Sequence, residues 1–376
     1  MPIEFKGSRK PTVGCEVEIQ LLDPETLDMK SAAVELLAVA KKTDGLRLKS
    51  ELTQAMVEIN TSVCQTIGEL GEDLQDQLNK LRSLARDRDL ELAVSGTHPF
   101  AHWRDSKIFP VERYRQIIDK FQWVGRRLNT FGLHVHVGVE DGERAIAIIN
   151  VLINYIPHLL ALSTSSPFWN GADTGMESCR VAIFASFPTG GLPYFFVDWK
   201  EFQRYFAALN STGTIQSIRD IYWDIRPHFD FGTIEVRVCD GVSSLKETLG
   251  IAALIQCLIV WIDSQYQKGQ RSRQIHMQHY WLAPENKWQA ARYGLDGQII
   301  VQEGTERKLL RSHLAELLQT LAPTAQSLRC EKELKYVEEI LKRGSSAARQ
   351  RMVFSKTNSL KAVASALVKE LKDSIE

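Results

Sequence analysis

The chain has 376 residues, and its 46 Lys and Arg side chains balance its 46 Asp and Glu side chains. A neutral chain lacks the overall charge that would draw it to nucleic acid or to an anionic membrane, so any functional charge must be local. Its six cysteines are scattered without a CxxC spacing. This predicts reduced core thiols of a cytoplasmic protein and excludes a disulfide framework.

The predicted elements, taken in chain order, mix strands and helices. Apolar alternation predicts strands at residues 13–20, 46–49, 56–60, 90–95, 131–139, 221–226 and 232–239. Helical periodicity predicts helices at 32–42, 70–88, 112–129, 144–162 and 245–267, and in segments from about residue 276 to the end. We therefore expect an α+β fold with one antiparallel sheet in residues 10–270 and a helical part in 271–376. No repeat or low-complexity linker divides residues 1–376, so we expect a single domain.

Two apolar stretches, 145–162 and 248–262, need a check against membrane insertion. The first is interrupted by Asn150, Asn154 and Pro157, and the second is too short to span a bilayer. We interpret both as buried core helices. The start of the chain shows no export signal, and we expect a soluble protein that binds no membrane.

Polar side chains lie in or beside four predicted strands, and in three of these stretches they are two residues apart and share one face. They are Glu16 with Glu18, Glu51 with Glu58, His134 with His136 and Glu235 with Arg237. Each pair has a plainer explanation alone: a solvated strand face, a core pair or a cross-strand salt bridge. Burying a lone carboxylate is costly, so acids in apolar strands need a partner. Four such stretches together favour a bound cation.

The composition of these stretches indicates the cation and its chemistry. Several carboxylates, one or two imidazoles and no thiolate favour Mg²⁺ or Mn²⁺ over zinc. Magnesium usually meets phosphate in its remaining positions. No GxxxxGK[ST] loop and no HExxH motif is present, so a nucleotide would be held through metals. A metallohydrolase and a non-catalytic nucleotide or metal sensor are the alternatives.

Several motifs along the chain resemble those of the glutamate–cysteine ligase type 2 family. Its members are carboxylate–amine ligases related in fold to glutamine synthetase. The motifs lie at residues 14–18, 58–61, 96–100, 132–138, 166–169, 173–174, 178–180, 223–227 and 232–237. The resemblance implies a curved antiparallel sheet that holds ATP and two or three Mg²⁺ ions, with Mn²⁺ as a substitute. It further implies that glutamate and L-cysteine, or another amine, are joined through an acyl phosphate, and we expect a homodimer.

The resemblance also implies roles for individual residues. Glu18, Glu51 and Glu58 would hold the ion beside the substrate carboxylate. The ion that bridges the ATP phosphates would be held by Glu16, His134 and Glu235. His136 and Arg237 resemble phosphate-side residues, and Arg237 would offset charge on the transferred phosphoryl group.

Other residues are weighed on their own chemistry. Arg180 could capture a substrate carboxylate or form a structural salt bridge, and Arg226 could contact phosphate or pair with Asp224. Glu177 departs from the family pattern and could reshape the acceptor pocket. The rings of Trp169, Trp199 and Trp223 could stack on adenine, but core packing explains each of them better.

Overall fold

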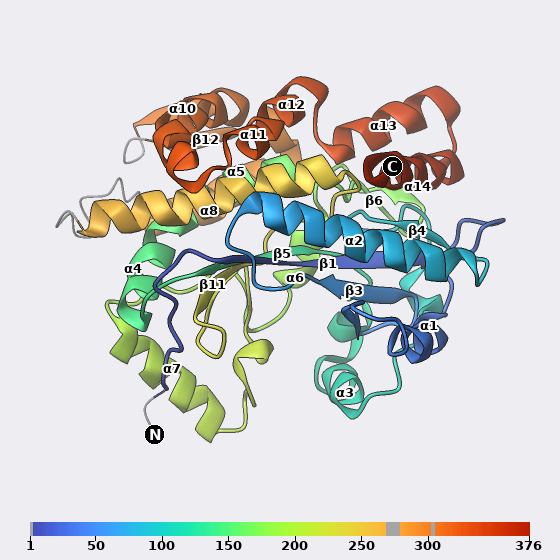
Figure 1. Ribbon diagram of the computed structural model, residues 1–376, viewed down its shortest axis with the longest axis horizontal. Helices are drawn as coiled ribbons and strands as arrows, with labels where there is room; N and C mark the ends of the chain where they lie inside the picture. The colour runs from blue at the N-terminus through green and yellow to red at the C-terminus, as the bar shows by residue number, and fades with distance from the viewer. Residues whose placement is uncertain (1–2, 268–278, 302–304) are drawn as a thin grey trace.

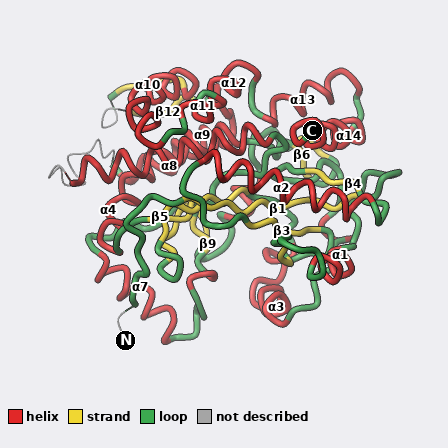
Figure 2. The backbone as a smooth tube through the Cα atoms, in the orientation of Figure 1, coloured by secondary structure: helices red, strands yellow, loops and turns green. Residues whose placement is uncertain are grey.

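The computed structural model describes residues 3–267, 279–301 and 305–376, and its centre is one antiparallel sheet (Figures 1 and 2). Six strands run in the order β10, β11, β5, β1, β3, β2, and a seventh, β4, pairs with the C-terminal end of β1. Their bounds are β1 Val13–Leu22, β2 Leu48–Ser50, β3 Met56–Asn60, β4 Glu91–Ala93, β5 Leu133–Gly138, β10 Ile225–His228 and β11 Thr233–Val236. Every pairing is antiparallel, which confirms the predicted α+β fold.

Apolar alternation decides which face of the sheet carries the acids. On β1, Val17 and Ile19 belong to the main hydrophobic core, whereas Glu16 and Glu18 alternate with them and line a cavity on the opposite face. Burying each aliphatic side chain contributes about 1.5–3 kcal/mol. A slip of β1 by one residue would bury both glutamates in the core, so the hydrophobic pattern fixes the register.

The strand registers align polar residues from distant parts of the chain in rows across this face. One row holds Lys49, Glu58 and Glu18, the next holds Glu16 and His134, and the third holds His136, Glu235 and Arg226. Neighbouring strands lie about 4.8 Å apart, so partners within a row can touch through their side chains. Pairing between strands, and not proximity in sequence, therefore assembles the polar face.

Helices cover the two faces of the sheet differently (Figure 1). Helices α2 and α8 lie along one face, the C-terminal helices lie beyond α8, and α3 and α7 lie on the opposite side. Helix bounds are α1 Ala33–Ala40, α2 Ile67–Arg86, α3 Glu112–Arg126, α4 Gly142–Leu152, α5 Ile156–Ser163, α6 Arg180–Phe184, α7 Trp199–Ser211, α8 Leu245–Gln267, α9 Ala283–Tyr293, α10 Leu310–Leu328, α11 Glu331–Leu334, α12 Tyr336–Arg343, α13 Ser346–Thr357 and α14 Leu360–Ile375. The C-terminal part thus lies on the side of the sheet away from the polar face.

Two helical stretches, Gly142–Ser163 and Leu245–Gln267, are long and apolar enough to cross a membrane by length and composition. In each, 83% of the most apolar window is buried inside the fold. Helix α8 is apolar on all sides because it packs against both the sheet and helices α10 to α12. This burial agrees with the prediction of two core helices.

The structure differs from the predicted elements in several places. Within 279–376, a region predicted to be helical, β12 (Gln298–Val301) and β13 (Glu306–Leu309) form a hairpin. The start of that region, up to residue 278, lies outside the described residues. The predicted strand 221–226 breaks at Asp224, because β9 (Tyr222–Trp223) leaves the main sheet to pair with β8 (Gly190–Gly191). Helix α7 was not predicted, and the loop at 165–180 contains a short hairpin of β6 (Phe168–Trp169) and β7 (Ala172–Asp173).

Candidate active site

The polar face of the sheet forms the floor of a cavity of about 290 Å³, and α3 and the segment before β9 contribute to its walls. Its titratable lining residues are Glu16, Glu18, Lys49, Glu51, Glu58, Arg113, Tyr114, His134, His136, Arg219, Tyr222, Arg226, His228, Glu235 and Arg237. All six residues predicted as metal ligands therefore lie in one cavity, together with three of the four predicted to act on phosphate or substrate. Arg180 is the exception.

At one end of the cavity three carboxylates crowd together. Single oxygens of Glu18, Glu51 and Glu58 lie within 4.8 Å of one another. Burial, and after it the charges of Glu16 and Glu18, raises the pKa of Glu58 to about 8. Burial and then the charge of Glu58 raise the pKa of Glu51 well above its usual range. Lys49 lies 3.7 Å from Glu58, but one exposed ammonium cannot neutralise the group, which therefore suits a divalent cation.

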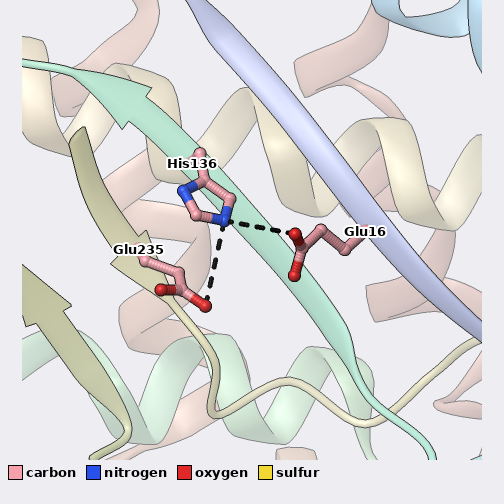
Figure 3. Close-up of side chains that lie close together, drawn as sticks. All are labelled: Glu16, His136 and Glu235. Carbon is pink, nitrogen blue, oxygen red and sulfur yellow. Dashed lines mark ion pairs between the residues drawn. The ribbon is translucent and has the colours of Figure 1, made fainter. Parts of the chain in front are cut away.

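A second cluster, drawn in Figure 3, joins Glu16, His136 and Glu235. His136 Nε2 lies 3.9 Å from Glu16 Oε1 and 3.8 Å from Glu235 Oε1. The other ring nitrogen, Nδ1, lies 3.0 Å from the Thr233 hydroxyl, which fixes the orientation of the ring. Here His136, predicted as a phosphate-side residue, takes the place in the cluster that was predicted for His134.

His134 belongs instead to a third cluster, with Glu16 and Glu58. Its Nδ1 lies 3.3 Å from Glu16 Oε2. Burial and then the charge of Arg237 lower the pKa of His134. Burial opposes ionisation of Glu16, yet the His134 hydrogen bond and the charge of His136 outweigh it and lower the pKa of Glu16 to about 2. Among the described residues, Nε2 of neither histidine has a hydrogen-bond partner, so both nitrogens could bind a metal ion.

Two arginines flank Glu235 at the other end of the cavity. Arg226 donates from Nε and Nη2 to both oxygens of Glu235, at 2.6 and 3.2 Å. Its Nη1 donates to the carbonyl oxygens of Ile218 and Ile221. Burial alone would raise the pKa of Glu235, but Arg226 and then Arg237 hold it well below its usual range. Since all three guanidinium nitrogens of Arg226 are engaged, its first role is to hold Glu235.

Arg237 is the better placed of the two arginines to meet an anion in the cavity. Its Nη1 donates to Glu235, and its side chain is 14% exposed, against 6% for Arg226. The pairing of Arg226 with Asp224, considered from the sequence, is not formed. Asp224 instead accepts from Lys287 Nζ at 2.7 Å.

Arg180 lies behind the cavity and not in it. It is 3% exposed and donates to the carbonyl oxygens of Val238 and Arg237 at 3.3 and 3.2 Å. Its Nη1 lies 3.8 Å from the buried Asp240. A Cβ on Gly132 would meet Arg180 Nη2 at 2.3 Å, so the glycine leaves room for this guanidinium. The geometry matches the alternative of a structural salt bridge, here with Asp240, and the hydrogen bond from Arg180 also holds the backbone of Arg237.

Glu177 also lies away from the cavity. Its Oε1 accepts from Arg351 Nε at 3.1 Å, and Arg351 donates as well to the Met176 carbonyl oxygen at 2.7 Å. The loop is thereby attached to helix α13. The expectation that Glu177 reshapes an acceptor pocket is not supported by this position.

Several lining residues were missed by the sequence reasoning. Tyr114 on α3 donates to the Ser50 carbonyl oxygen at 2.7 Å, and Arg113 pairs with Asp220 at 2.8 Å. Lys49 alternates with Ser50 on a strand too short to show a pattern. Helix α3 is amphipathic but contains no motif, so only the fold brings these residues to the cavity. Phe231 was missed as well, although the aromatic residues of the turn between β10 and β11 gave a usable signal.

A profile of the Glutamate-cysteine ligase family 2 matches residues 12–366. A protein of Gloeobacter violaceus with the provisional name glutamate–cysteine ligase 2 is 42% identical over 369 residues, 96% of this chain and 97% of its own length. One of Thermobifida fusca with the same provisional name is 42% identical over 376 residues, 99% of this chain and 94% of its own.

Solved structures share the fold at low sequence identity. A glutamate–cysteine ligase of Francisella tularensis in complex with AMP aligns with a TM-score of 0.67 at 13% identity, covering 99% of this chain and 94% of its own. A bifunctional glutathione synthetase of Pasteurella multocida aligns with a TM-score of 0.61 at 12% identity, covering 97% of this chain and 52% of its own. At such identities the likeness extends to the fold alone.

Proposed function

Because the chain belongs to the glutamate–cysteine ligase family 2, and is thus an enzyme of the carboxylate–amine ligase class, we propose that it joins glutamate to L-cysteine. The reaction consumes ATP and yields γ-glutamylcysteine, ADP and phosphate. The glutamate γ-carboxylate attacks the γ-phosphorus of ATP to give an acyl phosphate and ADP. The cysteine amine then attacks the acyl carbon, and phosphate leaves. We further propose that residues 1–376 form a single catalytic domain; the homodimer and the cytoplasmic location stay predictions.

The observation that carries this proposal is the run of three overlapping clusters along the cavity floor. One cluster consists of Glu18, Glu51 and Glu58. Glu58 also belongs to the cluster with Glu16 and His134, and Glu16 also belongs to the cluster with His136 and Glu235. Acids this close repel one another unless cations lie between them. Oxygen-rich groups with two imidazoles and no lining cysteine fit Mg²⁺ or Mn²⁺. Such ions, when bound, screen the charge of nucleotide phosphates.

The chain's own residues supply the other requirements of phosphoryl transfer. Arg237 places a fixed positive charge beside Glu235, where it can stabilise negative charge on a phosphoryl group. Arg226 holds Glu235 bidentately and so fixes the ligand that both arginines share. The strands hold these groups rigidly, which favours in-line geometry. Tyr114 and Leu52 contribute to the walls of the cavity.

The test is phosphate release from ATP with Mg²⁺ and glutamate, with and without a panel of amines led by L-cysteine. We expect release to require glutamate and one amine together, and to stop when EDTA removes the metal. Amide cleavage without ATP would favour the hydrolase. Binding of ATP and Mg²⁺ without turnover on any amine would favour the sensor.

The position of Glu177 gives a prediction about acceptor choice. A Glu177→Gln variant should lower the unfolding midpoint by about 1–3 °C, because a partly exposed ion pair contributes about 0.5–1 kcal/mol. Turnover and the KM values for both substrates should not change. Differential scanning fluorimetry and the phosphate assay check this, with Glu339→Gln on an exposed face of α12 as the control. A changed acceptor preference would restore the role expected from the sequence.

A further inference from the structure

One large aromatic side chain at the edge of the cavity is more than half exposed. Phe231, in the turn between β10 and β11, lines the cavity and is 53% exposed. The other lining aromatics, Tyr114, Phe184 and Tyr222, are only partly exposed and pack against a small apolar core. Phe231 thus offers exposed aromatic surface inside a polar cavity, and aromatic side chains that line such cavities commonly contact ligands.

Phe231 is held in one orientation by its neighbours. Its ring stacks on the ring of His228, with centroids 4.1 Å apart and planes inclined by 4°. His228 itself is 3% exposed and so provides a fixed support. The backbone N–H of Phe231 donates to the His228 carbonyl oxygen at 3.1 Å, which closes the turn. One ring face is therefore covered, and the ring presents its other face.

The N-terminal segment fastens the same turn to the body of the protein. The backbone N–H of Lys6 donates to the Phe229 carbonyl oxygen at 2.9 Å. Gly232 has φ +65°, and a Cβ there would lie 1.8 Å from the Lys6 carbonyl oxygen. Only glycine fits this close approach. The aromatic platform of His228 and Phe231 is thus preorganised.

The platform lies next to the cluster of Glu16, His136 and Glu235. The Phe231 ring centroid is 5.8 Å from that of His136, whose Nε2 faces Glu16 and Glu235. A ligand whose charged end lies at that cluster and beside Arg237 would extend its next part over Phe231. In a nucleotide, the part beyond the phosphates and the ribose is a flat aromatic base. Any nucleobase can stack on an aromatic side chain.

We propose that the face of Phe231 turned away from His228 is the surface on which the adenine ring of ATP stacks. The inference rests on the proposed function and names the part of the cavity that takes the base. It also gives the orientation of the substrates in the cavity. The base lies at the β10–β11 turn, and the amine reacts near the opposite end, toward the carboxylates of Glu18, Glu51 and Glu58. A side chain of the amine acceptor is the competing occupant of the platform.

Isothermal titration with Mg²⁺–ATP and with Mg²⁺–tripolyphosphate, which lacks the sugar and base, tests the proposal. Phe231→Leu keeps an apolar side chain but removes the ring, and we expect it to weaken ATP binding about tenfold or more. Tripolyphosphate binding should not change. Phe231→Trp should retain ATP binding. Trp288→Leu, which removes a 51% exposed ring on α9 outside the cavity lining, is the matched control.

The other outcomes overturn the proposal in separate ways. Equal loss of ATP and tripolyphosphate binding in Phe231→Leu would mean that the side chain shapes the phosphate end. Unchanged ATP binding with a raised KM for the amine would assign the platform to the acceptor. Failure of the wild-type protein to bind ATP at all would overturn the proposed function as well, whereas wild-type ATP binding with an unaffected Phe231→Leu variant overturns this inference alone.

Discussion

A Glu235→Gln variant is expected to lose ATP-dependent turnover by about a hundred- to a thousandfold, the range seen when one preorganised electrostatic group is removed. Glu235 is wholly buried and shared by Arg226, Arg237 and His136. Glutamine keeps the shape but not the charge, so the cluster with Glu16 loses an anionic ligand and both arginines lose their counter-ion. The phosphate-release assay measures the loss.

The same variant should be less stable, and a matched variant separates the two effects. Leaving buried charges without their partner costs about 3–5 kcal/mol. Glu247 on α8 is another buried carboxylate, which pairs with the partly exposed Arg349 at 2.8 Å and does not line the cavity. Glu247→Gln should lose some stability in chemical denaturation, but less than Glu235→Gln because Arg349 keeps Glu370 at 2.8 Å, while its folded fraction keeps full turnover. Near-normal turnover in folded Glu235→Gln protein would contradict the assignment of Glu235 to the phosphate side.

Elements with a strong local pattern were predictable from the sequence. The bounds of β3 and α8 match the predicted 56–60 and 245–267, and β1 extends only two residues further. In each case apolar periodicity and burial agree, so local preference and tertiary packing favour the same structure. The β12–β13 hairpin is different, because β13 is largely polar and exposed, and alternation gives no signal there.

The candidate site was predictable as a set of residues but not as a set of contacts. His134 and His136 are two apart on one strand, and the sequence cannot say which of them meets Glu235. The register of β5 with β11 places His136 opposite Glu235, and this pairing depends on the whole sheet. Arg226 likewise finds its partner across the strands and not two residues away at Asp224.

Glu58→Gln gives the second large expected effect, on stability and on metal response. In the folded protein the pKa of Glu58 is raised to about 8 from an ordinary value of 4.5. Between those values the folded state holds the proton more tightly than the unfolded state, so metal-free stability falls as the pH rises through this window. Glutamine cannot ionise. Metal-free Glu58→Gln should match the wild type near pH 4.5 and exceed its unfolding midpoint by several degrees at pH 8.

Magnesium should reverse that order, because a bound cation converts the repulsion among Glu18, Glu51 and Glu58 into attraction. At pH 8, Mg²⁺ should raise the unfolding midpoint of the wild type more than that of Glu58→Gln, and the variant should lose turnover. Differential scanning fluorimetry at several pH values, with Mg²⁺ or EDTA, makes the measurement. Glu91→Gln, an exposed acid on β4 of the same sheet, should behave as the wild type. A Glu58→Gln protein that is less stable than the wild type in EDTA at pH 8 would show that a structural contact of Glu58, and not charge crowding, governs this end of the cavity.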